Sequence, residues 1–242
     1  MHSEDFELFS PGHLLALALV VAALAGTLWA ARRVESEQQK KRGAALLAFG
    51  LLGLEVVATV RKQLIVGFDP MLSIPLHLCD LAFLAMFGAL LTRRRFLYEF
   101  AYFFGFGGAF FALLTPNLDD PLTDFFSIRY FISHSGVCLS MVYLTIAFGL
   151  RPTWRSVPRM FVAGNLYMVL AGAVNWLAGT NFGYLSHKPA VPTLLDHLGP
   201  WPYYLIWYEV IALVVLPLLY LPFYFYDRVR GSQVETRLDS CG

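Results

Sequence analysis

The segment 74–80, Ile-Pro-Leu-His-Leu-Cys-Asp, places three chemically active side chains in a stretch that is otherwise apolar. They are the imidazole of His77, the thiol of Cys79 and the carboxyl group of Asp80. Ionisable groups inside a bilayer are costly unless they are paired or hydrated, so they usually face a bundle interior or an aqueous cavity. We therefore expect a functional site around this segment.

Several chemistries suit these residue types. His77 is a candidate general base, with Asp80 holding its imidazole in one tautomer. The same pair has two other readings: two metal ligands, or a structural hydrogen-bonded pair. Cys79 is a candidate nucleophile, although buried thiols are more often inert core residues. His134, in another apolar run, is a candidate second acid or base, or a donor to an oxyanion.

The other polar residues of the apolar runs and their connections are candidate substrate-binding groups. Glu55 and Lys62 are seven residues apart, which places them on one helix face as an ion pair or gate. Arg129 and Lys188 are candidates for binding a lipid phosphate. The full set of substrate-binding candidates is Glu55, Lys62, Arg129, Asn175, Tyr184, Lys188 and Glu209.

Composition identifies the class of protein. Hydrophobic residues make up 57% of the 242 residues and charged residues only 14%, with a mean hydropathy of +0.58. These values indicate an integral membrane protein. Seven apolar runs are each about long enough to cross a ~30 Å hydrocarbon core. They predict an all-α bundle of seven transmembrane helices in one domain, 1–242, with helices at about 12–31, 43–66, 71–91, 97–115, 128–150, 158–178 and 203–226.

Charge in the connections predicts the topology. Lys and Arg gather in 32–42, 93–95, 151–159 and the C-terminal tail, whereas the opposite connections hold only Lys188. The positive-inside rule then places the N-terminus outside and the C-terminus in the cytoplasm. We expect a bacterial cytoplasmic (inner) membrane location. The formal net charge of +1 comes without a basic docking face, so nucleic acid is not an expected partner.

With this topology, the polar residues of six helices fall in the outer half of the bilayer. Their common depth predicts one shared pocket there. The long connection 179–202, rich in proline and aromatic residues, is either a lid over that pocket or an interfacial aromatic cap.

Five longer motifs carry a resemblance, and they are the runs 74–80, 105–117, 129–136, 175–189 and 194–204. Together they resemble the YwaF-like family of bacterial integral membrane proteins. More distantly, the chain is similar to vertebrate multi-pass proteins implicated in acyl transfer onto lyso ether phospholipids. That similarity implies roles for His77, His134 and Glu55. The cysteine proposed as nucleophile in those proteins corresponds to Leu76, so a covalent mechanism does not carry over.

These observations predict a lipid-modifying enzyme that performs phospholipid acyl transfer or ester hydrolysis and acts on membrane lipids without a cofactor. His77, Asp80, His134 and Cys79 are its candidate catalytic residues. One alternative is a lipid-binding or transport protein that uses the intramembrane His, Asp and Glu residues as a proton or ion path. Another is a zinc-dependent hydrolase with His77, Asp80, His134 and Glu209 as ligands.

Overall fold

The computed structural model describes residues 6–67, 69, 71, 74–116, 118, 120–189 and 194–239. All regular structure in these ranges is helical, which confirms the all-α prediction. Among the described residues, six helices are long and apolar enough to cross a membrane. The chain divides into two compact units, Met1–Leu150 and Arg151–Gly242, and each is described by itself.

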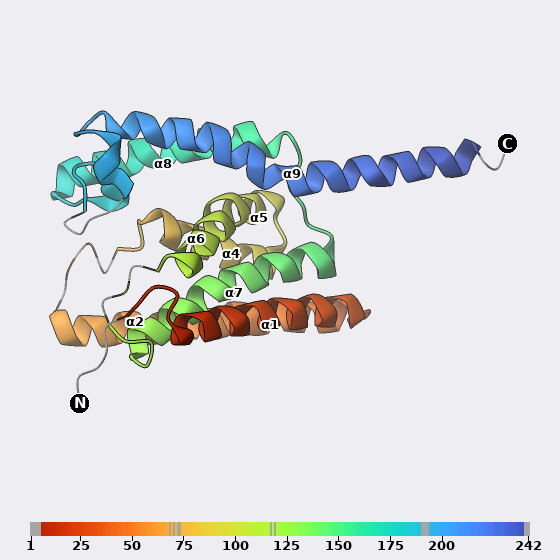
Figure 1. Ribbon diagram of the computed structural model, residues 1–242, viewed down its shortest axis with the longest axis horizontal. Coiled ribbons are helices and arrows are strands. Elements are labelled where there is room, and N and C mark those ends of the chain that lie inside the picture. The colour runs from red at the N-terminus through yellow and green to blue at the C-terminus, as the bar shows by residue number, and fades with distance from the viewer. Residues whose placement is uncertain are drawn as a thin grey trace. The chain divides into compact units, whose positions relative to one another are not determined.

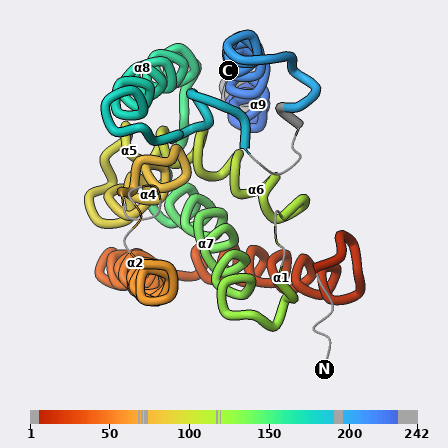
Figure 2. Tube along the Cα trace, turned by 90° about the vertical axis from the view of Figure 1, so that its left-hand side faces the viewer, coloured from red at the N-terminus to blue at the C-terminus, as the bar shows by residue number. Residues whose placement is uncertain are grey.

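The first unit is built around α7, which packs against α1, α2 and α6. Figure 2 shows α7 running between α1 and α2. The helical chain from α5 to α6 is continuous, and its middle part, η1, is a π-helix. The elements of this unit are α1 (Pro11–Arg33), α2 (Glu37–Val66), α4 (Leu78–Thr92), α5 (Arg95–Phe100), η1 (Ala101–Phe106), α6 (Gly107–Leu114) and α7 (Phe125–Phe148).

The second unit pairs α8 (Ser156–Ala178) with α9 (Tyr204–Asp239), as Figure 1 shows. Two short 3-10 helices lie between them in sequence, η2 (Phe182–Tyr184) and η3 (Leu194–Leu198). The helix α9 continues well beyond a membrane-spanning length and contains Pro217 and Pro222.

The third predicted span differs most from the structure. We expected a helix over 71–91, but α4 begins only at Leu78 and has 15 residues. Fifteen residues rise about 22 Å, which is less than a ~30 Å hydrocarbon core. Six spans are thus confirmed as candidates, while a seventh span and the orientation of the termini stay predictions.

The late start of α4 has a local cause. Proline disfavours helical backbone at the residue before it, which here is Ile74. His77 is the N-cap of α4, with extended dihedral angles (φ −64°, ψ 149°). The Asp80 Oδ2 atom accepts a hydrogen bond of 3.1 Å from the backbone N–H of His77, so this carboxylate satisfies a donor at the helix start. His77 and Asp80 therefore do not share a helix face as expected; they form the helix cap.

Small residues bring the helices of the first unit close together. Gly105 in η1 is buried, and a Cβ atom there would lie 3.2 Å from Val137 Cγ1 and 3.3 Å from Ala82 Cβ. Gly136 in α7 lies directly against Leu51 of α2, where a Cβ atom would overlap the leucine side chain. These contacts hold α2, α4 and α7 close enough for their polar side chains to meet.

A buried histidine fixes α1 in this unit. The His13 Nε2 atom donates to the carbonyl oxygen of Leu113 at 3.0 Å, and its Nδ1 atom accepts from the backbone N–H of Phe9 at 3.1 Å. Its ring also packs edge-on against Phe131 of α7. His13 is fully buried and both ring nitrogens are bonded, so its role is structural.

Candidate functional site

The central feature of the first unit is a polar cluster between α2 and α7. The carboxylate of Glu55 accepts hydrogen bonds from Arg129 Nη2 and Ser133 Oγ. The side chains of Glu55 and Arg129 are only 17% and 33% exposed. Such a pair is stable only because its charges and hydrogen bonds compensate for lost hydration.

The spacing of residues along both helices produces this cluster. Arg129, Ser133 and Gly136 lie on one face of α7, because they are separated by four and three residues. Glu55 lies four residues after Leu51 on α2, and Leu51 is the residue that packs against Gly136. The glycine contact therefore brings Glu55 to the level of Arg129 and Ser133.

This pairing corrects the prediction for Glu55. We expected its partner to be Lys62, which lies seven residues further along the same face of α2. The structure pairs Glu55 with Arg129 instead, and Lys62 is exposed. A lysine near a helix end extends its amine toward water, whereas a facing helix can present a guanidinium at the depth of the carboxylate.

One donor of Arg129 is left over. Its Nε atom is buried and has no hydrogen-bond partner among the described residues. A buried donor without a partner costs about 1–3 kcal/mol. An oxygen atom of a bound ligand would satisfy this N–H group, which makes Arg129 a candidate ligand-binding residue as the sequence predicted.

His134 follows Ser133 and is held in a defined orientation. Its Nδ1 atom lies 2.8 Å from the carbonyl oxygen of Tyr130, and its ring centroid is 4.1 Å from that of Tyr130. Because a carbonyl oxygen only accepts, Nδ1 carries the proton and the neutral ring has its lone pair on Nε2. The Tyr130 hydroxyl in turn donates to the carbonyl oxygen of Ala112 at 3.1 Å. The arrangement suits a general base at Nε2.

The start of α4 lies in the same region. This helix packs against both α2 and α7. The predicted contact of Asp80 with the His77 imidazole stays a prediction, since the bond given above is to the His77 backbone.

Cys79 is exposed, with its Sγ atom 4.0 Å from Asp80 Oδ1. A reactive cysteine needs a neighbour that stabilises its thiolate, and a carboxylate does the opposite. Within the part of the chain that the structure describes, no three His, Cys, Asp or Glu side chains form a group able to hold a metal ion.

Four predicted substrate-binding residues, Asn175, Tyr184, Lys188 and Glu209, belong to the second unit. Glu209 of α9 accepts a hydrogen bond of 3.1 Å from Asn165 of α8, a residue that the sequence analysis did not single out. The shared pocket that includes both units stays a prediction.

The connection after α8 is tied down by side chains. The Asn175 amide donates to Phe182 O at 2.9 Å, and its oxygen accepts from Phe182 N at 2.7 Å and Thr180 Oγ1 at 2.9 Å. The carbonyl oxygen of Tyr184 accepts from the Tyr204 hydroxyl. The Lys188 amine lies 4.0 Å from Asp196 Oδ1 and over the Tyr204 ring. These contacts fix Asn175, the Tyr184 backbone and Lys188 within the connection, and the substrate-binding roles of the three residues stay predictions.

The described part of this connection therefore has many contacts that fix it to α8 and α9. Residues 190–193 lie outside the described residues. The lid proposed for 179–202 stays a prediction.

Replacing Asn175 with alanine should destabilise this connection strongly. The change removes three hydrogen bonds and leaves both backbone groups of Phe182 without their partner, so we expect a loss of about 2–3 kcal/mol. Thr180→Val is the matched control, because it removes one of the same bonds and should cost about 1 kcal/mol. Thermal unfolding in detergent measures both. Equal losses for the two variants would contradict the role given to Asn175.

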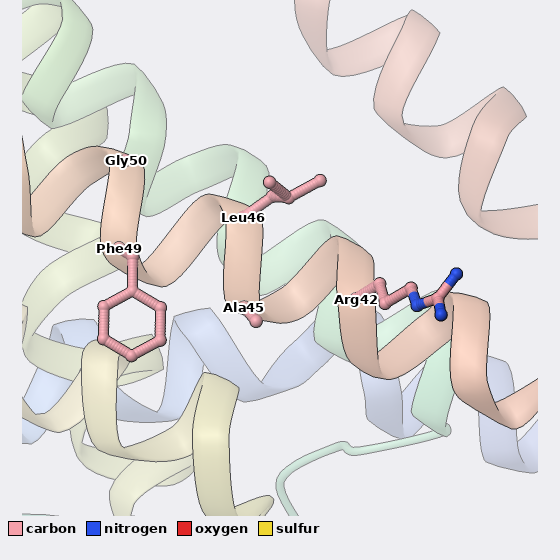
Figure 3. A pocket seen from close by; sticks show the side chains of 5 residues that line it. All are labelled: Arg42, Ala45, Leu46, Phe49 and Gly50. Carbon is pink, nitrogen blue, oxygen red and sulfur yellow. The ribbon is translucent and has the colours of Figure 1, made fainter.

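An open hollow of about 450 Å³ lies on α2, on the N-terminal side of Glu55, and its lining residues are Arg42, Ala45, Leu46, Phe49 and Gly50 (Figure 3). Its side chains are largely apolar apart from Arg42. It contains none of the predicted site residues.

Residues 8–220 match the family model of the TMEM164 family. The chain belongs to the TMEM164 family. The TMEM164 match includes the site helices α2, α4 and α7 together with α8, and it supports an integral, multi-pass membrane protein.

A relative from Treponema pallidum (strain Nichols), an uncharacterized protein, is 27% identical over 214 residues, covering 87% of this chain and 86% of the relative. No solved structure matches the chain. The TMEM164 family membership thus establishes the class of protein.

Proposed function

We propose that this protein is a lipid-modifying enzyme that transfers an acyl group between phospholipids, or hydrolyses a phospholipid ester, at the cluster of Glu55, Arg129, Ser133 and His134. The observation that carries the proposal is the fixed orientation of the His134 imidazole. Its Nδ1 bond to Tyr130 leaves Nε2 as the basic atom, and Arg129, five residues before it on α7, retains an unused donor.

The chemistry follows from these two groups. His134 Nε2 accepts the proton of an attacking hydroxyl group, from a lysophospholipid or from water, as the hydroxyl oxygen bonds to the ester carbonyl carbon. Arg129 Nε–H donates to the oxyanion that forms on the carbonyl oxygen. The carbon–oxygen bond of the donor ester then breaks, and the departing alkoxide takes the proton from His134. The products are a new ester, or a free fatty acid, and a lysolipid.

This mechanism needs no acyl group bound covalently to the protein. That agrees with Leu76, which stands where the similar vertebrate proteins have a cysteine. In the proposal, Glu55 holds Arg129 in place through its carboxylate. His77 is a second proton-handling group at the start of α4, and Asp80 fixes its backbone. Membrane lipids are the substrates, and the bacterial cytoplasmic (inner) membrane is the proposed location.

The test is a lipid turnover assay in liposomes. Purified protein is mixed with a lysophospholipid and a diacyl phospholipid carrying an isotope label in its acyl chains. Label in a new diacyl product supports acyl transfer, and label in free fatty acid supports hydrolysis. Absence of both over a range of donor and acceptor lipids would overturn the proposal.

A second candidate function is proton or ion movement, because both units place a carboxylate in an apolar helix, Glu55 in α2 and Glu209 in α9. A substrate-dependent current in liposomes that disappears in Glu55→Gln would favour this function over catalysis. A current that persists in Glu55→Gln would count against it.

A further inference from the structure

An arginine that the sequence analysis did not select lies near the end of α2. The guanidinium carbon of Arg61 is 4.5 Å from the ring centroid of Phe125 and 5.7 Å from that of Phe126. The two phenylalanines are the first residues of α7. The side chain of Arg61 is exposed, and the described part of the chain provides no ion pair for it.

The position of Arg61 along α2 corresponds to the membrane interface. Arg42, on the same helix, is nineteen residues away, which is about 28 Å at 1.5 Å per residue. This separation is close to the ~30 Å thickness of a hydrocarbon core. The apolar stretch of α2 between the two arginines then fills the bilayer, with one guanidinium at each headgroup layer.

The aromatic contact leaves the guanidinium able to bind an anion. A guanidinium over a phenyl ring is attracted to its face, while its N–H groups point outward in the guanidinium plane. Phosphate oxygens match that edge with two parallel hydrogen bonds. Lys62 is exposed next to Arg61 and adds a second positive charge. Asp124 is the residue before Phe125, and its carboxylate caps the start of α7 by accepting a hydrogen bond of 2.7 Å from the backbone N–H of Phe126.

We propose that Arg61, supported by Phe125 and Phe126, binds the phosphate of a glycerophospholipid. Glu55 is six residues further into the membrane along α2, about 9 Å deeper. In a glycerophospholipid the ester groups lie below the phosphate, on the side of the acyl chains. A lipid held at Arg61 therefore presents its esters toward the depth of Glu55 and its partner Arg129.

The proposal rests on the proposed function for the identity of the reacting ester, but the binding of phosphate is independent of it. It specifies the substrate class: glycerolipids with a phosphate are bound, and neutral glycerolipids without one are not selected. Arg61 would then be a specificity-determining residue.

The experiment measures lipid binding without turnover. Purified protein is titrated with lysophosphatidylcholine and, separately, with monoacylglycerol of the same chain, and bound lipid is counted by native mass spectrometry. We expect Arg61→Gln to weaken lysophosphatidylcholine binding about tenfold, the loss of one bidentate charged contact, and to leave monoacylglycerol binding unchanged. Arg61→Lys, which keeps the charge but loses the planar edge, should lie between. Arg42→Gln is the matched control at the other end of α2 and should bind both lipids like the wild type.

Three outcomes of the lipid titrations would overturn the inference: unchanged lysophosphatidylcholine binding in Arg61→Gln, equal weakening for both lipids, or equal weakening in Arg42→Gln. Inorganic phosphate is added as a separate arm. Displacement of the lipid by millimolar inorganic phosphate would mean a site for free phosphate and not for a headgroup. If the protein binds lysophosphatidylcholine through Arg61 but turns over no lipid, this inference is retained and only the proposed function is rejected.

Discussion

Exchanging the charges of Glu55 and Arg129 is expected to restore the stability that either single change removes. Glu55→Arg places two guanidinium groups together, and Arg129→Glu places two carboxylates together, in a half-buried site. Breaking a buried pair costs about 3–5 kcal/mol, and partial exposure places this pair at the lower end. The double variant Glu55→Arg/Arg129→Glu recreates an ion pair, so the interaction energy of the mutant cycle should be about 2–3 kcal/mol.

Thermal unfolding of the wild type, the two single variants and the double variant in one detergent measures this energy. Lys62→Gln is the control, because Lys62 was the partner predicted from sequence but is exposed in the structure. It should unfold like the wild type. A double variant as unstable as the sum of the single changes, or a large loss in Lys62→Gln, would contradict the pairing.

Arg129→Lys should separate the structural role of Arg129 from its proposed role in catalysis. Lysine keeps a positive charge that can pair with Glu55, so we expect little change in the unfolding temperature. It lacks the Nε–H group, which is the unused donor of the site. Removing one donor to an oxyanion typically lowers kcat by 10²–10³-fold, and we expect a loss of about that size in lipid turnover.

The measurement is single-turnover lipid conversion together with the substrate concentration dependence. A fall in kcat with little change in KM supports a donor that acts on the transition state. Wild-type turnover in Arg129→Lys would remove the oxyanion role from the mechanism. Loss of stability equal to that of Arg129→Glu would show that the guanidinium itself is required for the fold.

The spans could be predicted from the sequence because membrane crossing depends on local composition. The runs predicted at 12–31, 128–150 and 158–178 correspond within a few residues to α1, α7 and α8. The start of α4 could not be placed this way, because hydropathy is continuous across Pro75. Two local signals do predict it: the restriction on the residue before proline and the carboxylate of Asp80 three residues after His77.

The site could be predicted only in part. Sequence patterns select ionisable residues in apolar runs, and they selected Glu55 and Arg129, which the structure pairs with each other. That these residues and His134 form a functional site stays a prediction. Sequence patterns do not select partners on another helix. Glu55 and Arg129 are 74 residues apart, and their meeting depends on the contact of Gly136 with Leu51.

The contact of Ser133 with Glu55 could have been predicted from its spacing along α7. Ser133 lies four residues after Arg129, so the two share a face of α7, and a polar residue at that position is a natural second partner for the same carboxylate. Arg61 shows the opposite case. Its role depends on the rings of Phe125 and Phe126, which only the packing of α2 against α7 brings to it.

The measurement that tests the account most directly is acyl transfer by His134→Ala in liposomes that contain a labelled diacyl donor and a lysophospholipid acceptor. His77→Ala and the wild type are assayed beside it, after each protein is shown to unfold at a similar temperature. General acid–base catalysis contributes about 10²–10⁴-fold, so His134→Ala should lose at least about 100-fold of the label transfer. Label transfer at the wild-type rate in both histidine variants would contradict catalysis at this cluster.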